Sequence, residues 1–339
     1  MHEEFGRGGV MAYTTIDDSE AYFQVKLYTG NGGTQSLTLG GETDMQPDFV
    51  WFKARSGDAA SHTLFDSVRG AQKRLNADSG NAESTLTTGL SSFDSDGFSI
   101  GSNADMNDNT VTYVAWCWKE TADAGFDIVS MTGTGSARTN AHSLSAVPEW
   151  IMVKELDNAG SWYTYTAMMG NTKSMFLNAT NAISADSSGY WNDTTPTSSV
   201  FSLGTDGGVN QSSTAYVAYL WRSIQGFSKF GSYTGNGNAD GTFVYTGFRP
   251  ATVVLKNTSG TNGWEMRDNK RPGYNLSSGT LAPQSTDAET TGEGIDILSN
   301  GFKLRASGNG QNGDGNTYIY MAWAEAPFVN SNGVPCNAR

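Results

Sequence analysis

Short apolar runs separated by polar, glycine-rich segments dominate the pattern of the 339-residue chain. Three runs are alike: each has six residues, begins with tyrosine and ends with tryptophan, and they occupy residues 113–118, 216–221 and 318–323. Their starting points are 103 and 102 residues apart. A run this short, rich in aromatic and β-branched residues and bounded by Asn, Asp, Gly and Ser, predicts a β-strand buried on both faces.

Three further motifs recur in the same order at a similar spacing. They are a Thr-Gly turn (29–30, 132–133 and 234–235), a proline-led apolar segment ending in lysine (47–53, 148–154 and 250–256) and a segment around a phenylalanine (97–101, 200–204 and 301–305). Four motifs in constant order indicate a tandem repeat of one domain. A unit of about 100 residues is large enough to fold by itself.

Turn residues divide the first repeat into short strands. We expect strands at residues 23–28, 36–39, 49–54, 61–66, 74–75, 91–93, 98–100 and 112–118. The segments between these strands are rich in Gly, Asn and Asp, which tolerate positive φ. The chain has 41 glycines but only 8 prolines, as expected for many tight turns. Six to eight strands in about 100 residues predict an all-β fold of three tandem homologous β-sandwich domains of the jelly-roll kind.

The motifs also predict the domain boundaries. We expect an N-terminal arm (1–24), three β-sandwich repeats (25–121, 126–223 and 227–328) and a C-terminal tail (329–339). The joints are only a few residues long, so the repeats should pack in a fixed arrangement, elongated or clustered. The arm has two possible starts, Met1 and Met11. Because it lies outside the repeats, we expect it to anchor the protein to a larger assembly.

Charge and composition argue against several classes of partner. The net charge of −13 and the pI near 4.6 disfavour a phosphate-binding surface, since nucleic-acid affinity comes mainly from Lys and Arg. No apolar run approaches the ~20 residues that span a bilayer, and the start lacks the pattern of a signal peptide. We expect a soluble protein with no nucleic-acid partner and no membrane insertion.

Catalytic motifs are missing from the sequence. Only His2, His62 and His142 occur, the last two at non-equivalent repeat positions, and there is no Gly-x-Ser-x-Gly or His-Glu-x-x-His motif. We therefore predict no enzymatic activity, no metal and no cofactor. Paired carboxylates for glycoside cleavage stay open as an alternative, because their separation is a property of the fold. Cys117 and Cys336 have no repeat counterparts, so we expect no disulfide framework, with Cys117 in the core.

Two loops are candidate binding sites. The first is rich in amides and carboxylates and contains Asn103, Asp105, Asn107 and Asp108. Such groups bind sugar hydroxyls or Ca²⁺, although any solvated loop uses them too. A similar segment, Asp94–Gly97, lacks the glutamate of a calcium loop, so a hairpin turn is favoured there.

The second loop contains Tyr190, Trp191 and Asn192. Most tryptophans lie in repeat motifs and are predicted to be core residues, whereas Trp191 has no aromatic counterpart in the other repeats. A loop aromatic of this kind suits sugar stacking, and packing against a neighbouring domain is an equal alternative.

Four segments together resemble a repeated domain of virion proteins from marine bacteriophages, which are labelled tail fibre or structural protein. They are Phe49–Lys53, Leu64–Gly70, Phe93–Phe98 and Tyr113–Trp118. The resemblance extends over essentially the whole chain. It implies a phage particle component with lectin-like β-sandwich domains, and it supplies no catalytic residues. The Phe-Asp-Ser-Val-Arg-Gly segment within Leu64–Gly70 is present only in the first repeat by this comparison.

These observations lead to one expectation and one alternative. We expect a non-enzymatic virion structural protein, displayed as a fibre or appendage, that binds host surface glycan and other virion proteins and forms a homo-oligomer, with a trimer favoured. The alternative is a capsid or tail decoration or adaptor protein that binds only other virion proteins. A glycan-degrading spike is a third, weaker reading.

Overall fold

The computed structural model describes residues 13–185, 188–272 and 275–336, and nearly all of its regular structure is β-strand. Within these ranges the only helices are one 3-10 turn, η1 (Ser19–Ala21), and two four-residue α-helices, α1 (Ala104–Asn107) and α2 (Gly207–Asn210). The all-β class is therefore confirmed. No helix in the described ranges is long and apolar enough to cross a membrane. The two candidate starts, Met1 and Met11, lie outside them.

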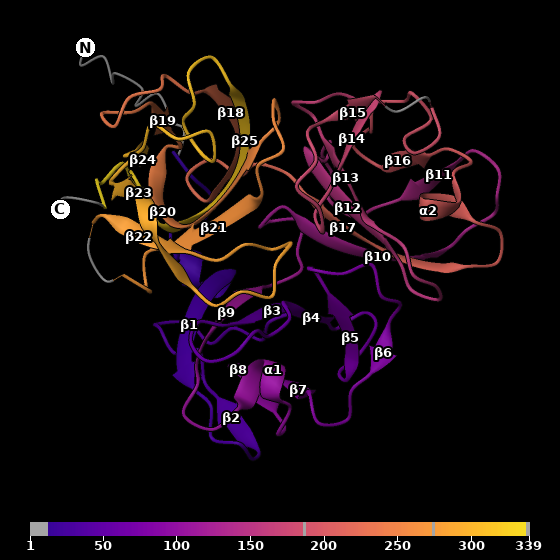
Figure 1. The fold of residues 1–339 in the computed structure, drawn as a ribbon, viewed down its shortest axis with the longest axis horizontal. Coiled ribbons are helices and arrows are strands. Elements are labelled where there is room, and N and C mark those ends of the chain that lie inside the picture. Colours follow the sequence, from indigo (N-terminus) through magenta and orange to yellow (C-terminus); the bar gives the residue numbers. More distant parts are fainter. Residues whose placement is uncertain (1–12, 186–187, 273–274, 337–339) are drawn as a thin grey trace, which may run out of the picture.

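Three large antiparallel sheets, one from each third of the chain, share a strand order. The first runs β1 (Phe23–Thr29), β9 (Thr112–Trp118), β3 (Phe49–Ala54), β4 (Thr63–Asp66), β5 (Lys73–Asn76), β6 (Ser84–Thr85). The second runs β10 (Phe126–Thr132), β17 (Ala215–Trp221), β12 (Trp150–Glu155), β13 (Trp162–Thr166), β14 (Lys173–Phe176), β15 (Ser184–Ala185). The third runs β18 (Ser228–Thr234), β25 (Thr317–Pro327), β20 (Phe248–Asn257), β21 (Trp264–Asp268). We call residues 23–118, 126–221 and 228–327 the first, second and third units; they form the three lobes of Figure 1.

A smaller antiparallel sheet accompanies each large one. They are β2 (Gln35–Leu37), β8 (Gly97–Ile100) and β7 (Leu90–Asp94); β11 (Arg138–Ala141) and β16 (Val200–Leu203); and β19 (Phe243–Tyr245), β24 (Gly301–Leu304), β23 (Thr290–Leu298) and β22 (Ser277–Thr280). In the first unit, side chains of the small sheet such as Leu37 and Phe98 share a core with Tyr113, Ala115 and Cys117 of β9. Tyr113, Ala115 and Cys117 all lie on one face of β9, because side chains along a strand alternate between its two faces.

The aromatic runs lie on β9, β17 and β25, and the other face of each of these strands is turned towards the centre of the molecule. Alternate residues of β9, including Trp116 and Trp118, belong to a second apolar core that all three units share. The prediction that these strands are buried on both faces is confirmed, since six consecutive residues of β9 and of β17 are buried. Alternation explains how one strand serves two cores.

The three repeat tryptophans, Trp118, Trp221 and Trp323, meet in this central core. The ring centroids of Trp118 and Trp323 are 5.2 Å apart, and those of Trp221 and Trp323 are 6.3 Å apart. The void left between the apolar side chains is about 10 Å³, scarcely enough for one water molecule. Truncating a buried tryptophan typically costs about 3–5 kcal/mol, so this contact ties the units together energetically. The arrangement is clustered rather than elongated.

The described part of the N-terminal arm packs on its own chain. Ile16 is 3% exposed and lies in the central core. The hydroxyl of Tyr13 donates to the carbonyl of Gly247 (2.8 Å), and Asp17 accepts a hydrogen bond from the backbone N of Ser331 (2.7 Å). The described part of the arm is therefore part of the fold, and its anchoring to a larger assembly stays a prediction.

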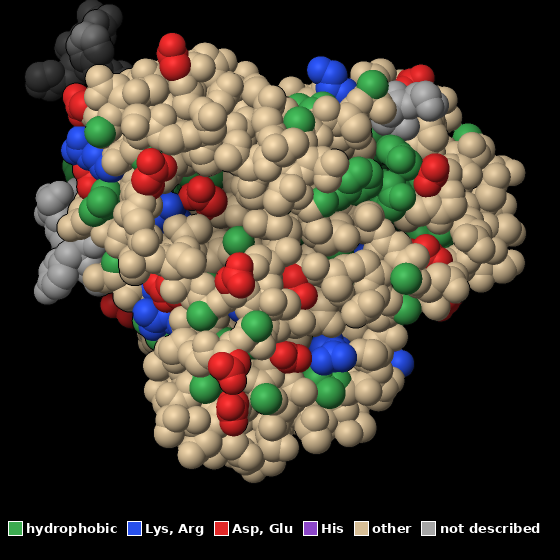
Figure 2. Space-filling model, in the orientation of Figure 1, with side chains coloured by type: hydrophobic (Ala, Val, Ile, Leu, Met, Phe, Trp, Pro, Cys, Tyr) green, Lys and Arg blue, Asp and Glu red, His purple; other side chains and the backbone are tan. Residues whose placement is uncertain are grey.

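The surface is polar over most of the face shown in Figure 2. Hydrophobic side chains there are scattered, except for one patch on the second unit between β13 and α2. Small scattered apolar groups are ordinary on a globular protein, whereas a contiguous patch marks a place to look for contacts.

Candidate functional site

The first predicted loop is α1 and its flanking residues, and its asparagine is structural. Asn107 is fully buried; its Nδ2 donates to the carbonyls of Gly33 (2.7 Å) and Gly101 (2.8 Å), and its Oδ1 accepts from the backbone N of Asn31 (3.0 Å). The same bonds recur at the equivalent residues, Asn210 and Asn312. A buried amide that holds a loop in all three units has no groups left for a ligand.

The neighbouring predicted residues are also largely engaged within the protein. Asn103 caps α1 by accepting from the backbone N of Asp105 (3.1 Å). Asp105 accepts from the backbone N of Ser61 (3.2 Å) and pairs with Arg74 (3.3 Å). Asp108 is the only exposed member of the predicted set. The loop is thus a structural element rather than an open sugar-binding rim.

The second predicted loop is split between the interior and the surface. Trp191 is 2% exposed; its ring lies 5.6 Å from that of Tyr165, and its indole N–H donates to the carbonyl of Lys173 (3.1 Å). A stacking platform needs an exposed ring face, so Trp191 does not provide one, and it packs inside its own unit rather than against a neighbour. Tyr190 is half-buried and Asn192 is exposed.

Backbone hydrogen bonds identify the counterpart of this tryptophan in the first unit. Gly204 donates to the carbonyl of Tyr190 (2.9 Å), just as Gly101 donates to the carbonyl of Gly89 (2.7 Å). The residue after Tyr190 therefore occupies the position of Leu90, which is fully buried. An apolar counterpart, rather than an aromatic one, was the signal that could have placed it in the core.

Sequence reasoning missed the polar contacts at the interfaces between neighbouring units, which we call seams. The last residue of each proline-led motif is a fully buried lysine: Lys53, Lys154 and Lys256. Each Nζ donates to a carbonyl of another unit: Lys53 to Thr286 (2.9 Å), Lys154 to Gly80 (3.4 Å) and Lys256 to Thr180 (3.2 Å). Burial lowers the pKa of each lysine to about 8. The contacts run in a ring, from first unit to third, third to second and second to first.

Aromatic residues at the start of the adjacent strand follow the same ring. The indole N–H of Trp162 donates to the carbonyl of Asn76 in the first unit (2.8 Å). That of Trp264 donates to the carbonyl of Phe176 in the second unit (3.0 Å). These bonds satisfy polar groups that would otherwise be buried without partners.

His62 takes the corresponding position in the first unit. It is fully buried; its Nδ1 accepts from the indole N–H of Trp51 (2.9 Å), and its ring contacts the backbone of Ala282 in the third unit. Burial, together with the charges of Lys53 and Arg271, lowers the pKa of His62 well below its ordinary value. The histidine is neutral and serves packing, so it is not placed for acid–base chemistry.

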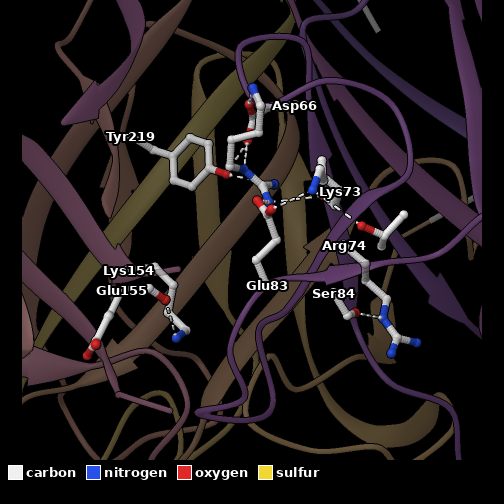
Figure 3. Close-up of polar contacts among 10 residues, drawn as sticks. Asp66, Lys73, Arg74, Glu83, Ser84, Lys154, Glu155 and Tyr219 are labelled. Atoms are coloured by element: carbon white, nitrogen blue, oxygen red, sulfur yellow. Dashed lines mark hydrogen bonds and ion pairs between the residues drawn. The ribbon is translucent and has the colours of Figure 1, made fainter. Parts of the chain in front are cut away.

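A charged network fills the seam between the first and second units (Figure 3). Arg69 pairs with Asp66 (2.5 Å) and with Glu83 (3.1 Å), and the hydroxyl of Tyr219 from the second unit donates to Asp66 (2.6 Å). The side chains of Arg69 and Asp66 are 3% and 0% exposed. Lys73 completes the network through Glu83 (3.3 Å). Tyr219 and Asp66 hold the pKa of Arg69 above its ordinary value despite burial.

The third unit has an equivalent pair, which corrects the expectation that only the first repeat keeps this segment. Arg271 pairs with Asp268 (2.7 Å) and lies 5.7 Å from the ring of Trp116 in the first unit. In the second unit Thr166 and Met169 occupy these positions. The segment therefore joins units to one another, and the seam between the second and third units lacks this ion pair.

Two neighbouring clefts lie where the joints meet the arm. One, of about 560 Å³, is lined by Tyr13 and the joint residues 222–225; the other, of about 440 Å³, is lined by Tyr13, Glu149, Lys229 and Tyr245. The Nζ atom of Lys229 lies 5.3 Å from the centre of the Tyr245 ring and donates a hydrogen bond to the backbone carbonyl of Tyr245 (2.9 Å). The second cleft combines aromatic and charged groups that can hold a small polar ligand.

A carboxyl pair lies at the joint between the first two units. Burial, a hydrogen bond with Asp127 and the charge of Asp48 raise the pKa of Glu120 to about 7. Its Oε1 accepts from the backbone N of Ile128 (3.0 Å). The hydroxyl of Ser223 accepts the corresponding bond in the second unit. The pair therefore holds the joint, and its raised pKa follows from that packing.

Other predicted positions have simple structural outcomes. Asp94 pairs with Gly97 across the turn between β7 and β8, which confirms the hairpin. Cys117 is fully buried in an apolar core, as predicted, and burial raises the pKa of its thiol; neither it nor Cys336 is in a disulfide. Among the described residues, no group of three or more His, Cys, Asp and Glu side chains is placed to hold a metal ion.

Comparison with known proteins gives one finding. The family model described as "Domain of unknown function (DUF7483)" matches residues 18–327. The match ends with the last residue of β25, so it includes all three units. No curated protein matches the chain. A family defined over the three units together agrees with the single core that they share.

Proposed function

The chain belongs to the DUF7483 family, and we propose that it is a non-enzymatic structural protein of a bacteriophage particle. The resemblance of its repeat motifs to phage virion proteins suggests this class. One observation supports the non-enzymatic part of the proposal: the buried charged side chains hold the units together. They are the three buried lysines and the pairs Arg69–Asp66 and Arg271–Asp268. Structural networks of this kind perturb pKa values without any catalytic role.

We also propose that the three units are copies of one lectin-like jelly-roll β-sandwich. Support comes from the strand order common to the three large sheets and from the buried asparagine at equivalent positions. Superposition of the experimentally determined units should place Trp118, Trp221 and Trp323 at equivalent positions. Unrelated positions for these residues would refute the common origin of the units.

As part of the particle, the protein is displayed as a fibre or appendage, contacts other virion proteins and binds host surface glycan. Individual sugar sites are weak, because sugar hydroxyls lose good contacts with water when they bind. Many copies on one particle raise the effective concentration and compensate for this weakness. We propose a homotrimer as the displayed form; light scattering of the purified protein tests this, and a monodisperse monomer would argue against it.

A decoration or adaptor protein is the second candidate, and one observation favours it. The three units surround a common centre, and their seam contacts run in a ring (Figure 1). A body of this kind presents three similar surfaces around one axis. Such surfaces suit a site of threefold symmetry in a larger assembly.

The location of the protein on the particle separates these roles. Gold-labelled antibodies against the purified protein should decorate particles at the tail or at an appendage if it serves attachment, and at the capsid or collar if it is a decoration protein. Particles lacking the protein should adsorb to host cells at least tenfold more slowly. Unchanged adsorption would remove the attachment role, and absence of the protein from particles would overturn both.

A further inference from the structure

A cluster of three aromatic residues lies between β13 and α2 of the second unit, where Figure 2 shows the hydrophobic patch. Tyr163 of β13 lies 4.7 Å from Tyr190 and 5.2 Å from Phe176 of β14, measured between ring centroids. All three side chains are partly exposed. Figure 2 shows the patch on the surface between β13 and α2. One side of the cluster packs on the core of the second unit, so the rings are held in place.

The other units lack this cluster at the same positions. Tyr163 pairs with Phe176 across the strands, and the corresponding pair in the first unit is Thr63 with Asn76. The first unit has Gly89 at the position of Tyr190. In the third unit Glu265 and Ala282 take the positions of Tyr163 and Phe176, as judged from strand register. The aromatic cluster is therefore not required by the repeat fold.

The helix beside the cluster has a glycine, with no side chain, at the point nearest to Tyr163. A Cβ atom at Gly208 of α2 would lie 2.1 Å from the hydroxyl of Tyr163. The first unit has Asp105 at this position, two residues after the residue that caps the helix. Glycine at position 208 thus allows the Tyr163 ring to lie against the loop.

Hydrogen-bonding groups surround the rings. The negative charge of Asp206 lies close enough to contribute, after burial, to raising the pKa of Tyr163 to about 12, so the phenol keeps its proton and remains a donor. Glu155 also contributes, and its carboxylate holds Asn158 (2.6 Å). Aromatic faces beside acceptors and donors match a sugar, whose ring has apolar C–H faces and polar edges. The charge of −13 disfavours an acidic sugar.

We propose that Tyr163 and Tyr190 form the binding platform for a neutral sugar, with Phe176 packed edge to face against the Tyr163 ring. This inference rests on the proposed attachment function and locates its site on the second unit alone. It transfers the predicted role from Trp191, which is buried, to the tyrosine that precedes it.

The test compares three variants of the full chain on an array of neutral and acidic glycans. Tyr190→Ala should weaken binding to neutral glycans at least fivefold, whereas Tyr190→Phe should stay within twofold because it keeps the ring. Phe243→Ala removes an aromatic ring that is 44% exposed on the third unit and lines neither cleft. It is the matched control, with binding expected within twofold of the unaltered protein. Thermal unfolding confirms that each variant is folded.

Several outcomes would overturn the platform. They are no binding of the unaltered protein to any neutral glycan, full binding by Tyr190→Ala, or an equal loss from Phe243→Ala. Loss of self-association in the sedimentation of Tyr190→Ala, compared with the unaltered protein, would show instead that the patch joins copies of the chain. Antibody labelling of particles is independent of these results, so the virion role can survive when the platform fails.

Discussion

Arg69 offers the sharpest test of how the units are held together. Arg69→Met removes the cation that faces Asp66, whose side chain is 0% exposed. The carboxylate keeps the hydroxyl of Tyr219 as a donor but loses its charge partner. Breaking a buried ion pair from one side typically costs 3–5 kcal/mol, because the remaining charge stays buried. We expect Arg69→Met to lower the free energy of unfolding by about that amount.

Another seam of the same protein shows which uncharged residues can replace the Arg69 network. At the seam between the second and third units, which lacks this ion pair, Thr166 and Met169 occupy the positions that Asp66 and Arg69 occupy in the first unit. Ile183 takes the place of Glu83, since the backbone N of each donates across its seam. The combined variant Asp66→Thr, Arg69→Met, Glu83→Ile, Tyr219→Phe removes the three charges nearest Tyr219 along with its hydroxyl. It leaves Lys154 and also Lys73, whose side chain is 42% exposed. Because apolar replacement of a whole buried network is often neutral or stabilising, we expect it to recover most of the loss.

Urea denaturation followed by circular dichroism and tryptophan fluorescence measures both variants. Coincident transitions from the two probes justify a single free energy of unfolding, and an unchanged m-value shows that the same surface is exposed. The reasoning is refuted if Arg69→Met costs less than about 1 kcal/mol, or if the combined variant is as unstable as the single one. Either result would mean that the network does not behave as a desolvated charge pair.

Two further predictions concern the first joint and the close turns. The pKa of Glu120 is raised to about 7 in the folded protein against an ordinary 4.5, so the folded protein keeps a proton that the unfolded chain releases. The contribution of Glu120 to stability should therefore be fully present below about pH 4.5 and be lost as the pH rises to about 7, and Glu120→Gln should remove this component from the Tm profile. An unchanged profile would mean that Asp127 does not share the proton. Gly133→Ala places a Cβ 2.1 Å from the carbonyl oxygen of Gln211 and should cost about 1–3 kcal/mol, whereas Gly292→Ala, with no atom within 4 Å, should stay within about 0.5 kcal/mol; equal effects in urea denaturation would contradict the close-approach argument.

The repeat and the strands could be predicted because both are local patterns. β3 and β9 span the residues expected from the apolar runs, 49–54 and 112–118. A six-residue apolar run with alternating side chains can only be buried on two faces, whichever partner covers each face. The hairpin at Asp94–Gly97 followed from its turn residues in the same way.

The candidate site was placed less well, since residue type does not reveal burial. Asn107 and Asp105 looked like ligands for sugar or Ca²⁺, yet they satisfy backbone and side-chain groups within the loop. Trp191 looked exposed because it is in a loop and has no aromatic counterpart in the other repeats, although it fills the position of Leu90. Comparing each position with its counterpart in another unit requires strand register, which only the structure supplies.

The amino-acid sequence by itself determined the all-β class and the strands that carry the aromatic runs, because periodicity and turn chemistry act over a few neighbouring residues. Only the tertiary structure decided that Lys53 reaches Thr286 and that Arg69 meets Tyr219, residues 233 and 150 positions apart. Those partners depend on closing three sheets around one core. No local pattern encodes that closure, since it arises from the packing of surfaces that are far apart along the chain.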